Sequence, residues 1–468
     1  KQNENINWFP DFLKHGRFGK GLETAPDWNI SRSRYWGTPM PVWIGERTEN
    51  QRILSSYAEL EKWAVEPSSI QNLVDYHREF LDDLEVWVDD EKTEKGRRVP
   101  DVFDCWVESG SMPYASIHYP FENKEKFEAS YPAQFITEYI AQTRAWFYTL
   151  HVMSVGIFGK PAFQNALTTG TLMAADGSKM SKSKKNYPDP MVVINKFGVD
   201  SLRLYLMSSV VMKADNSNFD ETALNEIRKK VFGIWWNVFA FYKLYGNQTK
   251  PLILPVKILH VMDRWIASRT MHVIQEVTSF MDAYDVVNTC RVLMAFIDEL
   301  STWYLRESRD RLRDKTNNGE ASQVFGWVLY TTAKLFAPIT PFFSELLYQH
   351  FDQVKVDSIH LEDWPVADKK YIDDGLETEM VLIRQVAEKA HAIRKEKKIK
   401  VRQPLATVTV VAPGKVLDGL SILRQEINVE EVVWAYKKDA ELSVRLDITI
   451  TDDLKAKGEM REVMRIIQ

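Results

Sequence analysis

The pentapeptide Lys179-Met180-Ser181-Lys182-Ser183 follows directly after a turn-forming Asp176-Gly177 and a serine in this 468-residue chain. Its chance expectation in a chain of this size is on the order of 10⁻⁴, from average composition. Two lysines and two hydroxyls in such a loop can close on a triphosphate, where ammonium groups stabilise the charge that develops during nucleotidyl transfer. The alternative is a solvated charge run, which is the usual interpretation of a lysine-rich loop. The rarity of the pentapeptide favours the catalytic interpretation.

The residues before this loop alternate between strand-like and helix-like patterns. Apolar runs at 133–136 and 166–172 are typical of buried strands, and helical segments accompany them. Such alternation favours an α/β layer with a largely parallel sheet. Residues 46–100 carry charge runs such as Asp89-Asp90-Glu91-Lys92, which indicate a surface insertion. The first 200 residues are therefore predicted to form an α/β region that this insertion interrupts.

The pattern changes at about residue 200, where apolar residues begin to recur at three- and four-residue spacing. This spacing predicts amphipathic helices at 201–205, 225–245, 262–280, 286–313 and 323–336. Glycine and proline interrupt the series at 246–255 and again at 338–341, before a helix at 342–351. Residues 201–365 are therefore predicted to form a helix bundle. A charged helix at 366–400 and an alternating strand at 406–411 predict a small α+β domain over 366–468.

The composition limits the classes of protein to which the chain can belong. Its 45% hydrophobic and 12% aromatic content supports real cores and argues against a disordered chain. The net charge of −5 argues against a protein that coats nucleic acid by bulk charge, but it allows a local basic groove. Neither the two cysteines, Cys105 and Cys290, nor the nine histidines have metal-ligand spacing, so no metal site is predicted. With no apolar run of about 18 residues and no signal-peptide pattern, we expect a cytoplasmic protein that makes no membrane contact.

The pentapeptide at 179–183 matches KMSKS, the second signature of the class I aminoacyl-tRNA synthetases, and the resemblance extends over most of the chain. Five further stretches are similar to segments of that family: 28–37 (WNISRSRYWG), 104–110 (DCWVESG), 135–147 (FITEYIAQTRAWF), 303–311 (WYLRESRDR) and 399–405 (IKVRQPL). The last of these, with HREFLDD at 77–83, resembles the isoleucine branch of the family more than the valine branch.

The resemblance implies a domain order. Residues 1–200 would be the C-terminal half of a Rossmann-like catalytic domain, 201–365 a helical anticodon-binding domain, and 366–468 an incomplete C-terminal junction domain. The family's first signature, HIGH, its editing domain and its zinc-binding cysteine clusters have no counterpart in this sequence. We therefore expect a truncated enzyme that is inactive alone and carries no zinc.

The resemblance also implies roles for single residues at the active site. Lys182, assisted by Lys179, would contact the phosphates of ATP, bound with Mg²⁺, in a loop that includes Ser181 and Ser183. Glu138 and Gln142 would hold the polar part of the aminoacyl-adenylate. Trp106 and Trp146 would offer flat apolar walls to a branched side chain, although ordinary core packing is the alternative for any tryptophan.

Basic residues in two places are candidate tRNA contacts. Arg306 and Arg309, next to Trp303, could grip phosphates while the indole stacks on an unpaired anticodon base. The alternative is a solvated helix face whose arginines pair with neighbouring carboxylates. A denser cluster begins at Arg394, Lys395 and Lys398, and it favours contact with an RNA backbone.

The reaction that the resemblance implies joins isoleucine to ATP and passes the acyl group to tRNA(Ile), and we expect the enzyme to be a monomer. The amino-acid carboxylate attacks the α-phosphate, so the protein supplies positioning and charge stabilisation and needs no nucleophile of its own. Two alternatives remain open: part of a valine enzyme, and a non-catalytic tRNA-binding module. The intact KMSKS loop argues against the second, because a pure binder has little use for a phosphate-closing loop.

Overall fold

The computed structural model describes residues 1–71, 73–181, 183–247, 249–314, 316–354 and 356–467, with side chains described as far as residue 463. The chain forms two compact units, one of residues 1–171 with 213–217 and the other of residues 172–212 with 218–468. Each unit has its own hydrophobic core. No helix within the described ranges is long and apolar enough to cross a membrane.

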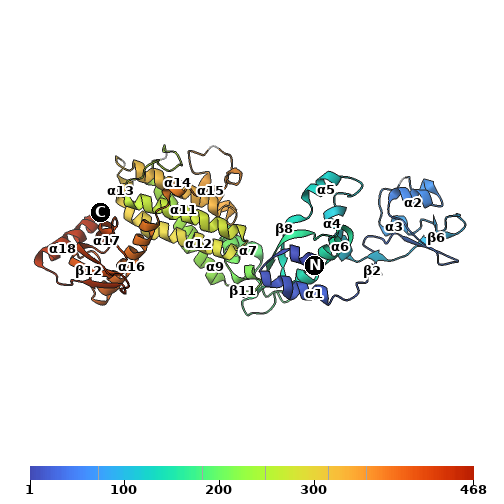
Figure 1. The fold of residues 1–468 in the computed structure, drawn as a ribbon, viewed down its shortest axis with the longest axis horizontal. Helices are drawn as coiled ribbons and strands as arrows, with labels where there is room; N and C mark the ends of the chain where they lie inside the picture. The colour runs from blue at the N-terminus through green and yellow to red at the C-terminus, as the bar shows by residue number, and fades with distance from the viewer. Residues whose placement is uncertain (72, 182, 248, 315, 355, 468) are drawn as a thin grey trace. The chain divides into compact units, whose positions relative to one another are not determined.

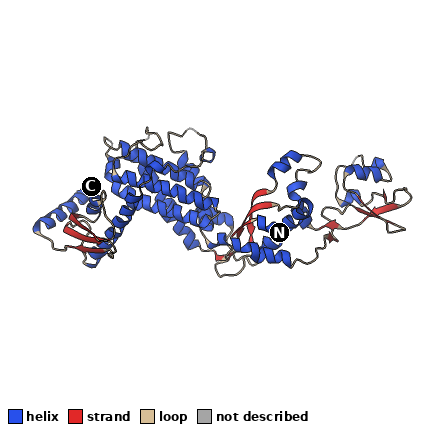
Figure 2. Ribbon diagram, viewed as in Figure 1, coloured by secondary structure: helices blue, strands red, loops and turns tan. Residues whose placement is uncertain are grey.

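A parallel sheet in the strand order β1-β9-β8 forms the centre of the first unit and confirms the predicted α/β layer (Figures 1 and 2). Parallel neighbours require a crossover, and helix α6 supplies it between β8 and β9. Trp8 and Phe18, with ring centroids 4.5 Å apart, pack in the core together with Phe147 and Phe163. The elements around this sheet are β1 (Asn7–Phe9), α1 (Gly19–Glu23), β2 (Ser31–Arg32), β7 (Val102–Phe103), α4 (Cys105–Ala115), α5 (Lys124–Ser130), β8 (Ala133–Tyr139), α6 (Trp146–Phe158) and β9 (Phe163–Thr169).

Helices α4 and α6 pack closely because Gly110 lies where they meet. A Cβ atom at Gly110 would lie 2.6 Å from Met153 Sδ and 3.3 Å from the backbone carbon of Thr149. A larger residue would require the Met153 side chain to move and the Thr149 backbone to give by a few tenths of an ångström, so glycine suits this close approach. This packing fixes α4, and the Trp106 side chain on it, against the start of α6.

Residues 42–98 form a small antiparallel sheet in the order β4-β3-β6-β5, at the place of the predicted insertion. Its core includes Trp43, which is 2% exposed and donates its indole N–H to the Leu84 carbonyl at 2.9 Å. The elements are β3 (Val42–Gly45), β4 (Gln51–Ile53), α2 (Tyr57–Trp63), α3 (Arg78–Leu81), β5 (Val86–Trp87) and β6 (Lys95–Arg98).

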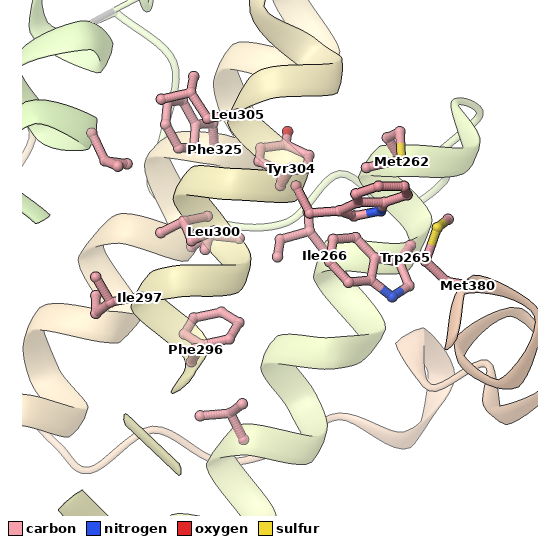
Figure 3. Packing of buried hydrophobic residues seen from close by; sticks show 14 of the residues in the cluster. Met262, Trp265, Ile266, Phe296, Ile297, Leu300, Tyr304, Leu305, Phe325 and Met380 are labelled. Atoms are coloured by element: carbon pink, nitrogen blue, oxygen red, sulfur yellow. The ribbon is translucent and has the colours of Figure 1, made fainter. Parts of the chain in front are cut away.

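A helix bundle makes up most of the second unit and confirms the predicted all-α region. Trp265 and Ile266 of α11 pack on Phe296, Leu300 and Tyr304 of the neighbouring helical segments (Figure 3). The predicted helix at 286–313 is continuous, because the residues at each junction between α12, the π-helical η8 and α13 keep right-handed helical dihedrals. The bundle contains α9 (Glu221–Ile227), η7 (Arg228–Gly233), α10 (Ile234–Tyr245), α11 (Val261–Asp282), α12 (Val286–Glu299), η8 (Leu300–Leu305), α13 (Arg306–Arg313), α14 (Gly319–Phe336) and α15 (Pro341–Tyr348).

A small α+β region follows the bundle. Helix α16 is long and charged as predicted, and Asp373 caps its start by accepting from the Leu376 N–H at 3.0 Å. Strand β12 pairs in parallel with β13 and antiparallel with β14. The elements are α16 (Asp374–Glu396), β12 (Leu405–Ala412), α17 (Leu420–Glu426), β13 (Val429–Tyr436), β14 (Ser443–Leu446) and α18 (Asp452–Ile467).

Candidate functional site

A tight turn leads into the KMSKS loop. The short strand β10 (Leu172–Met173) ends at this turn, where the Ala174 N–H donates to the Ser178 carbonyl at 2.9 Å. Gly177 has a φ of 79°, a left-handed conformation that glycine adopts without strain. Asp176 Oδ1 accepts from the Ser178 N–H at 2.9 Å, and this hydrogen bond holds the pKa of Asp176 below its usual value. The loop therefore starts from a defined backbone conformation.

Asn186 ties the two ends of the loop together. Its amide nitrogen donates to Ser178 Oγ at 2.8 Å and to the Lys179 carbonyl at 3.1 Å. Its carbonyl oxygen accepts from the Ser181 N–H at 2.9 Å. One asparagine after the signature thus satisfies two backbone groups within it and the Ser178 hydroxyl before it. The sequence pattern alone assigned no role to Asn186, whose contacts shape the loop.

One side chain of the signature anchors the loop to a hydrophobic core, and others are exposed or bonded within the loop. Met180 packs against the core cluster that contains Val193 and Phe197 of helix α7 (Pro190–Phe197), next to α8 (Val199–Met207). Lys179 is exposed, and the hydroxyls of Ser181 and Ser183 lie 2.7 Å apart. Lys182, the predicted principal phosphate contact, lies outside the described residues.

Asp104 organises the start of α4 in the first unit. It caps the helix by accepting from the Trp106 N–H at 3.0 Å, and its other oxygen accepts from the Trp28 indole at 3.3 Å and from Arg32. Burial alone would raise the pKa of Asp104, but these hydrogen bonds and the Arg32 charge hold it below its usual value. Two of the family-like stretches, 28–37 and 104–110, are therefore joined through one ionised carboxylate.

Glu138, Gln142 and Trp146 follow one another at the carboxyl end of β8, which is where doubly wound sheets bind ligands. Glu138 is exposed at the end of the strand. Gln142 Oε1 accepts from the Trp146 N–H at 3.0 Å and so caps α6. The Trp146 indole donates to the Ser109 carbonyl at 3.1 Å, which joins α6 to α4. In this structure Gln142 and Trp146 hold elements together, whereas the exposed Glu138 only accepts from the Tyr139 N–H at 3.1 Å.

A cavity of about 460 Å³ opens beside these elements, a volume that suits a small-molecule site. Of the four residues predicted to hold the adenylate, Trp106 borders this cavity, and the other three lie outside its described lining. The remaining wall consists of apolar and polar groups from the start of α6 and from the segment after α1, including Pro26, Trp28, Thr143 and Tyr148. The described residues contain no cluster of metal-ligating side chains.

The predicted tRNA contacts on the bundle have different surroundings. Trp303 is 4% exposed, and the guanidinium groups of Arg306 and Arg384 lie 5.5 and 5.9 Å from its ring centroid. Because its faces are covered, Trp303 offers no base a stacking surface in this structure, contrary to the expectation. Arg306 donates to Glu426 at 2.6 Å and is thereby neutralised.

Arg309 is exposed and lies over Phe241 at 5.9 Å, and Arg313 lies over Tyr245 at 5.5 Å. Within the described residues, neither arginine has a carboxylate partner. These two cations therefore form the free basic surface of α13.

In the C-terminal region, Arg394 also differs from the expectation. Its side chain is 1% exposed and donates to four backbone carbonyls, so it cannot also reach a phosphate in this conformation. Lys395 and Lys398 are exposed, as an RNA contact requires.

Comparison with known families identifies two segments of the chain. The family described as tRNA synthetases class I (I, L, M and V) matches residues 1–218. The anticodon-binding domain of tRNA ligase matches residues 263–410.

Curated relatives and solved structures agree with these matches. An isoleucine--tRNA ligase of Protochlamydia amoebophila is 40% identical over 92% of this chain, and one of Corynebacterium efficiens is 41% identical over 94%. The chain spans 42% and 41% of the length of these two relatives. A LeuRS of Agrobacterium radiobacter K84, solved in a ternary complex with tRNA and LeuAMS, aligns over 76% of this chain and 46% of its own, at 18% identity and a TM-score of 0.57. A methionyl-tRNA synthetase of Mycobacterium tuberculosis aligns over 75% of this chain and 59% of its own, at 16% identity and a TM-score of 0.51. These two likenesses concern the fold alone.

Proposed function

Because the chain belongs to the class I tRNA synthetases, we propose that it forms part of a cytoplasmic, monomeric enzyme that activates isoleucine with ATP and transfers it to tRNA(Ile). The observation that carries this proposal is the identity of 40–41% to isoleucine--tRNA ligases over 92–94% of the chain. The stretches at 77–83 and 399–405, which resemble the isoleucine branch, support the same amino acid.

On the ATP side, we propose that Lys179 and Lys182 stabilise the charge that develops on the triphosphate, with Mg²⁺ as its counterion. Ammonium groups stabilise a transition state best when they are in position before the reaction, because the site then need not rearrange as charge develops. The Asn186 hydrogen bonds and the packing of Met180 support this role, because they hold the loop in shape while leaving Lys179 exposed. Ser181 and Ser183 are the neutral hydrogen-bonding groups of the same loop.

On the amino-acid side, we propose that the cavity beside Trp106 receives the branched side chain. The indole supplies rigid apolar area, and a volume of about 460 Å³ is ample for an amino acid. Glu138 and Gln142 would hold the polar part of the adenylate, with Trp146 as a second wall. Glu138 meets this role most simply, since its carboxylate is exposed at the end of β8.

On the tRNA side, we propose that Arg309, with its neighbour Arg313, contacts the RNA from the bundle. Both lie over aromatic rings and lack carboxylate partners among the described residues, so their charge is available to phosphates. Lys395 and Lys398 would contribute from the C-terminal region.

The test is isoleucine-dependent exchange of pyrophosphate into ATP by the complete gene product. Lys179→Ala and Lys182→Ala should each lower the exchange rate, the latter by roughly 10²–10³-fold, with little change in isoleucine binding. Lys196→Ala is the matched control, because Lys196 is an exposed lysine that pairs with Glu221 at 2.7 Å outside the loop, and it should leave the rate within about twofold of the wild type. An unchanged rate in both loop variants would mean that the loop is a solvated turn.

A further inference from the structure

Arg394 is a buried cation that lies on helix α16 and has no carboxylate partner among the residues described. Nη1 donates to the carbonyls of Lys400 at 3.2 Å and Gln403 at 2.9 Å. Nη2 donates to the carbonyls of Ile427 at 2.8 Å and Asn428 at 2.9 Å. Burial lowers the pKa of Arg394 to about 10, so the group stays charged at neutral pH. A buried charge is costly unless hydrogen bonds replace its water, and these four carbonyls do so for Nη1 and Nη2, whereas Nε has no partner among the described residues.

The four carbonyls belong to two different segments. Two lie in the loop that follows α16, and two lie where α17 turns into β13. The planar guanidinium reaches both pairs at once, which an ammonium group on a single nitrogen cannot do. Asn428 adds a second link, because its side chain donates to the Val401 carbonyl at 2.8 Å. Gln403 adds a third by donating to the Leu454 carbonyl of α18 at 2.7 Å.

The loop that these links hold carries a dense positive charge. Residues 395–402, the end of α16 and the loop that follows it, are here called the basic loop and contain five cations and one carboxylate: Lys395, Lys397, Lys398, Lys400 and Arg402, against Glu396. Lys397 pairs with Glu396 at 2.9 Å, and Lys400 and Arg402 share Glu462 at 3.4 and 3.6 Å. Within the described part of the chain, Lys395 and Lys398 have no such partner. The basic loop is therefore a locally positive surface on a protein whose net charge is −5.

The backbone of the basic loop is held in one conformation. Lys398 has a left-handed φ of 57°, and the Ile399 N–H donates back to the Arg394 carbonyl at 2.9 Å, which ends α16. Fixed cations lose less conformational entropy on binding a polyanion than cations on a mobile loop do. The loop thus has both the charge and the rigidity that a phosphate-binding surface needs.

We propose that the basic loop is a preformed binding surface for the phosphate backbone of tRNA and that Arg394 is the positioning residue that holds it in shape. This inference rests on the proposed tRNA-dependent function. Charge complementarity identifies the partner, since an RNA backbone presents a regular row of anions to the exposed lysines. Arg394 itself touches no RNA and acts through the carbonyls of Lys400 and Gln403.

The first experiment compares binding of an isoleucine tRNA transcript to the 468-residue chain between about 50 and 200 mM KCl. The double variant Lys395→Gln/Lys398→Gln should bind more weakly, and its plot of log K against log salt should be flatter by about 1.4–1.8, because each lost contact removes about 0.7–0.9. The matched control is Lys437→Gln/Lys438→Gln. These exposed lysines follow β13 at the opposite end of the β12–β13 pair, about 23 Å away by the rise of an eight-residue strand. The control should keep the wild-type slope.

The second experiment tests the role of Arg394. Arg394→Lys retains the charge but loses the planar guanidinium that reaches both pairs of carbonyls. The variant should therefore bind tRNA more weakly, with a flatter dependence of log K on log salt, although all five cations of the basic loop remain. A role in stability alone would lower the melting temperature and leave the slope of the folded protein unchanged, which would overturn the assignment.

If Arg394→Lys does not fold, Asn428→Gly replaces it. Glycine suits the left-handed φ of 52° at this position, and the change removes both side-chain bonds of Asn428, the one it donates to the Val401 carbonyl and the one it accepts from Arg461. Arg394 keeps its four carbonyl acceptors in that variant, so the wild-type slope is expected, and a flatter slope would assign the positioning role to the Asn428 side chain instead of Arg394.

The outcomes for the two proposals can be told apart. If the wild-type chain does not bind tRNA, the proposed tRNA-dependent function fails and this inference fails with it. If the wild type binds with a steep salt dependence that Lys395→Gln/Lys398→Gln does not change, the basic loop is excluded while the proposed function stands.

Discussion

At the scale of single residues, Asp263 links two helical segments of the bundle. Its carboxylate is fully buried and accepts two hydrogen bonds from Arg311, each of 2.8 Å, and one from the Tyr304 hydroxyl at 2.8 Å. Burial and the nearby Asp263 charge raise the pKa of Tyr304 well above its usual value, so its hydroxyl remains a donor. The ion pair of Asp263 and Arg311 joins α11 to α13 and fixes which face of α13 is exposed to solvent.

Two arginines of α13 should therefore respond differently to the same substitution. Arg311→Gln leaves the Asp263 carboxylate buried without its cation, and the loss of stability should be about 3–5 kcal/mol. Arg309→Gln changes an exposed side chain and should alter stability by no more than about 0.5 kcal/mol, while weakening tRNA binding. Urea unfolding of both variants measures the difference. Equal losses of stability would contradict the division between a structural and a free arginine.

The sequence could predict the row of arginines on α13 but not this division. The four arginines have similar local sequences: Arg306, Arg309, Arg311 and Arg313. The carboxylates that neutralise two of them lie far away in the sequence. Asp263 precedes Arg311 by 48 residues, and Glu426 follows Arg306 by 120 residues. Arg394 is a similar case, since three of its four acceptors are backbone carbonyls more than eight residues away. Tertiary partners, which no local pattern encodes, decide whether a cation is free.

At the scale of elements, α13 and α17 meet through two carboxylates. Burial, followed by the hydrogen bond and charge of Glu426, raises the pKa of Glu307 to about 8. Burial acts in the same direction on Glu426, but hydrogen bonds from His391 and Glu307 and the Arg306 charge outweigh it and lower the pKa of Glu426. At neutral pH, Glu307 is therefore the protonated partner and donates to the ionised Glu426.

This pair predicts a pH dependence of stability. The folded state holds the Glu307 proton more tightly than the unfolded chain, in which the pKa is near 4.5. The stabilisation from Glu307 is therefore fully present below about pH 4.5 and is lost as the pH rises through about 8. Glu307→Gln, which keeps a neutral hydrogen-bonding group, should flatten the fall in unfolding free energy between these pH values. Unfolding measured across this range, with identical slopes in the variant and the wild type, would contradict the shared-proton arrangement.

Helices and strands whose apolar residues recur in a regular pattern were predictable from the sequence, and elements without such a pattern were not. The parallel strands β8 and β9 follow from apolar runs, and the bundle follows from helical spacing. Strand β13 escaped prediction because in its sequence, VEEVVWAY, two adjacent glutamates follow the first valine and break the alternation expected of a strand. At the site, the signature loop was predictable from its pentapeptide, but the Asn186 contacts that shape it are specific to the folded loop.

At the scale of the whole molecule, the candidate site residues are distributed over both compact units. The cavity beside Trp106 lies in the first unit, and the KMSKS loop, the bundle and the basic loop belong to the second. The predicted domain division placed the KMSKS loop with the catalytic residues before it, whereas the compact units place it with the residues that follow. This difference arises because Met180 and α7 share a core cluster with α8 and α9.

We propose that the cavity beside Trp106 and the KMSKS loop serve the activation of isoleucine. Amino-acid discrimination by the complete gene product is the most direct test of this proposal. The measurement is kcat/KM for pyrophosphate exchange with isoleucine, valine and leucine compared side by side. One methylene in an apolar pocket is worth about 1–3 kcal/mol, or roughly 10–200-fold, a general range to which isoleucine enzymes themselves contributed. We expect isoleucine to be preferred over valine by a factor within this range and valine still to be activated measurably. A preference for valine or leucine over isoleucine would contradict this proposal.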